Sequence, residues 1–130
     1  MPQKKTSYPD DWMTIARKDW QRVDLLLGFD DIDGAGFFLQ QAVEKYLKAF
    51  LLKKGWQLRR IHNLEALLAE ALEYEPSFEK YRFSCQTISA LYIVFRYPGG
   101  LESTLVESDI REMKRDISEL IEKIEKHFTE

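Results

Sequence analysis

Four polar side chains share one face of a mostly apolar stretch, residues 38–50. At about 100° per residue the four share one side of a helix: Gln41, Glu44, Lys45 and Lys48. Glu44 and Lys48 are spaced i,i+4 in the favourable order, which is worth about 0.3 kcal/mol for a surface pair. The stripe predicts either a solvated helix face or a polar groove shared with a second chain or a ligand.

A carboxylate interrupts the apolar stripe of the first predicted helix. Asp19 lies at the centre of that stripe, so we expect it to point toward the core or an interface. A charge in such a place is tolerated only when it is paired. The basic residues that we consider as its partner are Lys45, Lys48 and Arg96.

Arg96 ends the helix expected before Tyr97 and Pro98, at the flank of that helix's buried face. We expect it to lie near the polar side of residues 38–50 and to form a charged cleft there. A guanidinium in such a cleft can hold a phosphate at two points. The cleft is therefore the predicted place for any contact with a nucleotide or RNA.

Three blocks of sequence occur in the order and spacing of one protein family. They are Gln-Gln-Ala-Val-Glu-Lys-x-x-Lys-Ala at 40–49, Ile-His-Asn-Leu at 61–64 and Phe-Arg-Tyr-Pro at 95–98. On these blocks the chain resembles the HEPN domains, the higher eukaryote and prokaryote nucleotide-binding group. The resemblance extends from about Trp12 to Phe128. It implies a helical domain of the type that forms dimers and is often paired with a minimal nucleotidyltransferase.

The resemblance also implies a ribonuclease motif, of which this chain has one half. In HEPN ribonucleases an arginine that holds the phosphate is followed, after four to six residues, by a histidine that acts as general acid or base on the RNA 2′-hydroxyl. Arg96 matches the arginine, but the positions for the histidine hold Leu101, Glu102 and Ser103. We therefore predict no catalytic residue. An RNA-cleaving enzyme with an atypical acid or base, such as Glu102, is the alternative.

Two more residues match parts of the family. His62 precedes the expected helix cap Asn63, where either a structural role or ligand contact is open. In related toxin–antitoxin pairs, a tyrosine near the Arg/His motif is adenylylated by the partner nucleotidyltransferase, although its spacing differs from that of Arg96 and Tyr97. Tyr97 is thus a candidate for modification or a ring that simply packs. The full set of candidate ligand-binding residues is Asp19, Gln41, Glu44, Lys45, Lys48, His62, Arg96 and Tyr97.

The elements that must position these residues are all helical, with almost no strand signal. The expected helices run from Pro9 or Asp10 to near Gly28, from the 30–33 segment to about Lys54, from Leu64 to about Leu72, from the Pro76 break to 96, and from between Val106 and Asp109 to Phe128. Such helices predict an all-α fold, an antiparallel up-down four-helix bundle with a short additional helix.

Composition limits the remaining possibilities. The 130 residues, 45% of them hydrophobic, suit a single domain over 1–130 with its core at about 10–128. A net charge of −3 argues against a dedicated nucleic-acid binder and against DNA, while leaving room for a local basic patch. The single cysteine, Cys85, suits a reducing compartment, and we find no signal peptide or membrane span, so we expect a cytoplasmic protein. No metal site and no cofactor are expected, because ligand spacings and phosphate-binding glycine loops are missing from the sequence.

The resulting hypothesis is a non-catalytic HEPN-type module that acts with a nucleotidyltransferase or another partner, contacting nucleotide or RNA through a shared groove. A homodimer is expected because 13% aromatic residues is more than a core of this size can hide. The alternatives are the atypical ribonuclease and a purely structural interaction domain.

Overall fold

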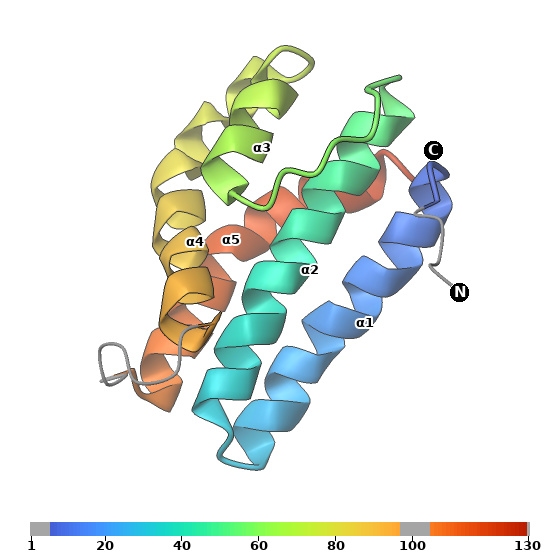
Figure 1. The fold of residues 1–130 in the computed structure, drawn as a ribbon. Coiled ribbons are helices and arrows are strands. Elements are labelled where there is room, and N and C mark those ends of the chain that lie inside the picture. Colours follow the sequence, from blue (N-terminus) through green and yellow to red (C-terminus); the bar gives the residue numbers. More distant parts are fainter. Residues whose placement is uncertain (1–5, 97–104, 130) are drawn as a thin grey trace.

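The computed structural model describes residues 6–96 and 105–129, with the side chains of 92–96 outside the description. These residues form five α-helices and one short 3-10 helix, with no strand among them. In chain order they are α1 (Pro9–Gly28), α2 (Ile32–Lys53), α3 (Leu64–Leu72), the 3-10 helix η1 (Pro76–Tyr81), α4 (Arg82–Arg96) and α5 (Glu107–Lys126), as Figure 1 shows. The predicted all-helical class is confirmed.

The helices begin and end where local sequence signals place them. Pro9 occupies the first turn of α1, where its missing N–H costs nothing. Asp31 caps α2 by accepting a hydrogen bond from the Gly34 N–H at 2.9 Å. Beyond α2 the chain turns at Gly55, whose φ of +93° is one that side-chain-bearing residues rarely adopt. The sequence did not predict η1, a separate 3-10 turn before α4, because its residues were assigned to a single longer helix.

Helix α2 is the central element of the fold. It runs antiparallel to α1 in a close helical hairpin and also contacts α3, α4 and α5 (Figure 1). Because neighbours cover it on several sides, most of its residues are buried, Glu44 and Lys48 included. The expectation that its polar stripe is a solvated face is therefore wrong.

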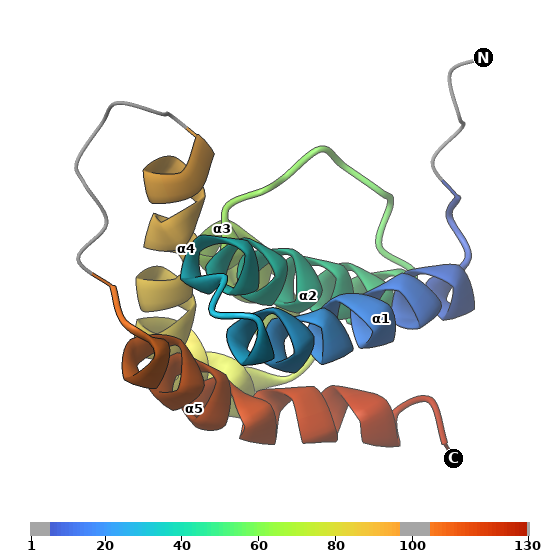
Figure 2. The same cartoon turned by 90° about the horizontal axis from the view of Figure 1, so that it is seen from below.

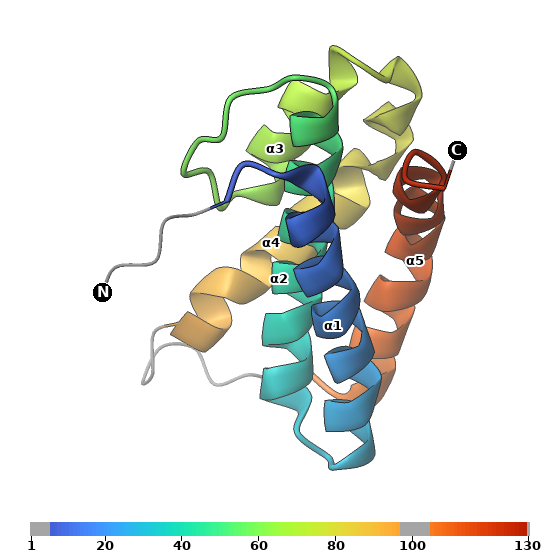
Figure 3. The same ribbon diagram turned by 90° about the vertical axis from the view of Figure 1, so that its right-hand side faces the viewer.

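Helix α4 crosses the other long helices at a steep angle. Figure 2 shows α1, α2 and α5 running in broadly the same line, with α4 standing across them, and Figure 3 shows the same inclination from the side. The helical class is thus established, whereas the up-down four-helix arrangement stays a prediction.

Helix α5 closes the core with the apolar stripe that its sequence predicts. Five residues of this helix are buried: Ile110, Ile117, Leu120, Ile121 and Ile124. Met113 and Phe128 from the same stripe are partly buried against the core. None of the described helices combines the length and the apolar character that crossing a membrane requires.

Candidate polar site on helix α2

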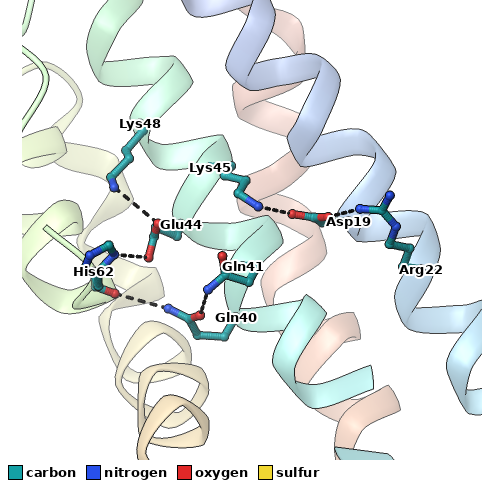
Figure 4. Close-up of polar contacts among 8 residues, drawn as sticks. All are labelled: Asp19, Arg22, Gln40, Gln41, Glu44, Lys45, Lys48 and His62. Carbon is teal, nitrogen blue, oxygen red and sulfur yellow. Dashed lines mark hydrogen bonds and ion pairs between the residues drawn. The ribbon is translucent and has the colours of Figure 1, made fainter. Parts of the chain in front are cut away.

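The polar residues of α2 belong to two separate groups (Figure 4). The first, which we call the α1–α2 triad, joins α2 to its antiparallel neighbour and consists of Asp19, Arg22 and Lys45. The second, the α2–loop network, joins α2 to the connection before α3 and consists of Gln40, Gln41, Glu44, Lys48 and His62.

The α1–α2 triad is built around a buried carboxylate. Asp19 is only 1% exposed, and each of its oxygens has a cationic partner. Lys45 Nζ lies 2.5 Å from Oδ2, and Arg22 Nη1 lies 2.6 Å from Oδ1. The inward position of Asp19 and its pairing with Lys45 are confirmed. Arg22 was missed, although residues three apart on a helix are neighbours and its spacing from Asp19 could have indicated it.

The α2–loop network is built around a second buried carboxylate. One oxygen of Glu44 lies 3.3 Å from Lys48 Nζ and the other lies 3.2 Å from His62 Nδ1. Glu44 is 4% exposed and Lys48 is 1% exposed, so water does not screen their attraction. The ammonium of Lys48 also lies 5.3 Å from the ring centroid of Trp12, where a cation–π interaction stabilises it further.

His62 links this buried network to the protein surface. Its side chain is 49% exposed, and it immediately precedes Asn63, which caps α3 through its side-chain oxygen. A carboxylate at Nδ1 holds an imidazole in one orientation, as in sites that transfer protons. Both roles that the sequence left open for His62, structural and ligand-contacting, are compatible with this position.

Two glutamines complete the network. Gln40 is fully buried, donates from Nε2 to the His62 carbonyl at 3.2 Å, and accepts from Gln41 Nε2 at 2.7 Å. Sequence reasoning named Gln41 and missed Gln40. Gln40 precedes Glu44 by four residues on the same helix face, and this periodicity could have indicated a shared buried environment.

The remaining predicted residues are not placed relative to these groups. Arg96 is the last residue of α4, but its side chain lies outside the described part of the structure, as does the whole of Tyr97. Of the eight candidates, the structure therefore brings together Asp19 with Lys45, and Gln41, Glu44 and Lys48 with His62.

Thiol and metal chemistry find little support in the described residues. Cys85 is fully buried, and this burial raises the pKa of its thiol to about 12, so little reactive thiolate exists at neutral pH. Within residues 6–91 and 105–129, no three His, Cys, Asp or Glu side chains come together as metal ligands would.

Comparison with known proteins places the chain in a family. No curated protein and no solved structure matches it significantly. The HEPN domain family matches residues 9–127, which is nearly the whole chain. The match spans all the described helices and both polar groups on α2. The chain belongs to the HEPN domain family.

Proposed function

We propose that this chain is a non-catalytic HEPN module that forms a homodimer and acts with a nucleotidyltransferase or another partner protein, contacting nucleotide or RNA. Family membership supports a nucleotide- or RNA-related module. We also propose that α1, α2, α4 and α5 are the four members of the up-down bundle, with α4 steeply inclined to the other three (Figure 2) and α3 as the additional helix.

The observation that carries the non-catalytic proposal is the internal neutralisation of both buried carboxylates. Asp19 is engaged by Lys45 and Arg22, and Glu44 by Lys48 and His62. A general acid or base must reach its substrate, whereas these carboxylates are at most 4% exposed. Such groups are suited to holding α1, α2 and the connection before α3 in place.

The sequence after Arg96 supports the same proposal. Leu101 and Ser103 cannot exchange protons near neutral pH, and Glu102 replaces the imidazole of the family motif by a more acidic group. Arg96 retains a charge that holds phosphate. The proposed outcome is therefore binding without cleavage.

A dimer is supported by apolar side chains that remain exposed around the turn between α1 and α2. Phe29 is 82% exposed, Leu25 is 62% exposed and Phe37 is 41% exposed. We propose that a second copy of the chain covers this patch, since HEPN domains often dimerise and a two-fold axis places the same patch on both partners. Sedimentation should show a dimer at tens of micromolar for the native chain and a monomer for the variant Leu25→Ser/Phe29→Ser.

The test of the missing activity uses a mixture of RNAs incubated with the purified chain, with and without a nucleotidyltransferase partner. We expect the RNA to remain intact, and we expect Arg96→Ala to weaken any RNA or nucleotide complex. Metal-independent cleavage that Arg96→Ala abolishes would refute the non-catalytic proposal.

The ribonuclease alternative is favoured by one observation, the contact of half-exposed His62 with buried Glu44. In this pair the carboxylate fixes the orientation of the imidazole, as it does for a histidine that acts as general acid or base. In that case His62→Gln would abolish RNA cleavage while changing the stability of the fold by no more than about 1 kcal/mol, because a glutamine amide can still donate a hydrogen bond to Glu44. Under our proposal the native chain shows no cleavage for this variant to remove.

A further inference from the structure

A second charged surface lies away from the polar groups of α2, in a groove between α1 and α5. The groove holds about 380 Å³ and is lined by Trp20, Asp24, Arg111, Lys114, Arg115 and Ser118. Three of these side chains are cationic and one is anionic, in a chain whose net charge is −3. The groove is thus a local basic patch on an acidic protein.

Lys114, one of the residues that line this groove, is held in a defined position. Its ammonium lies 4.6 Å from the ring centroid of Trp20 and 2.8 Å from Asp24 Oδ2. Its side chain is only 15% exposed, whereas that of Asp24 is 60% exposed. A lysine fixed in this way has already lost most of its rotamer freedom, so a ligand that binds it loses less entropy on binding.

The two arginines line the groove from successive turns of α5. Arg111 pairs with Glu107 at 3.2 Å, but both side chains are about half exposed, at 47% and 49%, and such surface pairs contribute little. Arg115 forms no ion pair with any residue that the structure describes. Because they are spaced i,i+4, the two guanidinium groups start from the same side of the helix.

We propose that this groove binds phosphate groups, supplied by an RNA strand or by a free nucleotide. A phosphate offers several acceptor oxygens to two guanidinium forks, and its higher charge lets it displace the exposed Glu107 carboxylate. Lys114 adds a point charge beside the two guanidinium groups. The inference rests on the proposed function, to which it adds a phosphate contact on α5 that does not involve Arg96.

The groove contains its own optical reporter. Trp20 is partly buried at the groove, whereas Trp12 and Trp56 are buried at 7% and 8% exposure. Fluorescence titrations of the full chain should use four probes: a ten-nucleotide uridine RNA, ATP, inorganic phosphate and a short poly-glutamate. The groove variant is Arg111→Glu/Arg115→Glu. The control, Lys18→Glu/Arg60→Glu, makes the same change in net charge at exposed positions elsewhere.

We expect the groove variant to weaken phosphate-ligand binding about tenfold or more, and the control to change it less than about twofold. Saturable RNA binding with weak ATP and phosphate binding identifies a strand as the source; comparable binding of ATP identifies a nucleotide. Equal loss in both variants, equal binding of poly-glutamate, or no binding of any phosphate probe would overturn the proposal. Circular dichroism of each variant checks that it is folded.

Failure of this proposal is distinguishable from failure of the proposed function. If Arg96→Ala abolishes RNA binding while the groove variant binds normally, the groove assignment is refuted and the non-catalytic module stands. If the native chain cleaves RNA, the non-catalytic assignment is refuted, whichever variant affects binding.

Discussion

Replacing Glu44 by glutamine should destabilise the protein far more than the i,i+4 spacing of Glu44 and Lys48 suggests. The substitution keeps the size and shape of the side chain and removes its charge. The Lys48 ammonium, which lies 3.3 Å from the Glu44 carboxylate, then loses this charge–charge contact in a place where its side chain is 1% exposed.

The magnitude follows from burial. Breaking a buried ion pair by removing one partner costs about 3–5 kcal/mol, because the remaining charge is uncompensated. The glutamine oxygen can still accept a hydrogen bond from Lys48, and the Trp12 ring remains 5.3 Å from its ammonium. We therefore expect the lower end, about 3 kcal/mol, or roughly 10 °C in Tm for a chain of this size. A surface pair at the same spacing would be worth only about 0.3 kcal/mol.

The assay is urea denaturation at pH 7 followed by circular dichroism, on Glu44→Gln, Lys48→Met and the double variant. The double variant removes both charges of the pair, so it should be more stable than the sum of the single changes predicts, by about 2 kcal/mol. The matched control is Glu107→Gln, an exposed i,i+4 pair with Arg111, which should change stability by less than about 1 kcal/mol. A cost for Glu44→Gln no larger than that of this control, or strict additivity, would refute the argument from burial.

Three further predictions concern other parts of the fold. Burial raises the pKa of the Cys85 thiol from its ordinary value of 9.0 to about 12, so between these pH values only the unfolded chain ionises the thiol. The contribution of this group to the unfolding free energy should therefore be constant below pH 9 and fall by about 1.4 kcal/mol for each pH unit above it. This slope should be reduced between pH 9 and 10 in Cys85→Ala, and equal slopes in the two proteins would contradict the assignment. Gly55→Ala should cost about 1 kcal/mol in urea denaturation, because φ at Gly55 is +93°, although an added Cβ would meet no atom within 4 Å. Gly28→Ala should be neutral or stabilising, because Gly28 is equally uncrowded and has no positive φ. Similar changes in unfolding free energy for the two variants would show that φ is not decisive. Phe50→Ala should cost about 3–5 kcal/mol because the ring is fully buried, whereas Phe83→Ala should cost less than about 0.5 kcal/mol because Phe83 is 77% exposed. Near-equal decreases in Tm for the two variants would contradict this packing.

The inward position of Asp19 is an example of what helical periodicity alone can predict. A carboxylate at the centre of an apolar stripe must be buried or paired, and the sequence limited its partners to a few cations. Lys45 was one of these cations, and in the structure it pairs with Asp19. Arg22 could have been added from its i,i+3 spacing, because neighbours on one helix depend only on local geometry.

The environment of Glu44 and Lys48 shows where periodicity fails. A helical wheel groups polar residues correctly, but it does not tell whether water or another element covers that side. Here α1, α3, α4 and α5 all contact α2, and His62 reaches Glu44 from 18 residues further along the chain. The same stripe on a helix at the edge of the fold would be a solvated face.

The sequence by itself determined the helical class, the ends of most helices and the family, because caps, prolines, glycines and short motifs act within a few residues of the chain. Only the tertiary structure decided that the polar stripe of α2 is divided between the α1–α2 triad and the α2–loop network, and that the cations of α5 form a groove with Trp20 of α1. The physical reason is that burial and charge pairing depend on which distant segments pack together. The sequence of a single helix does not contain that information.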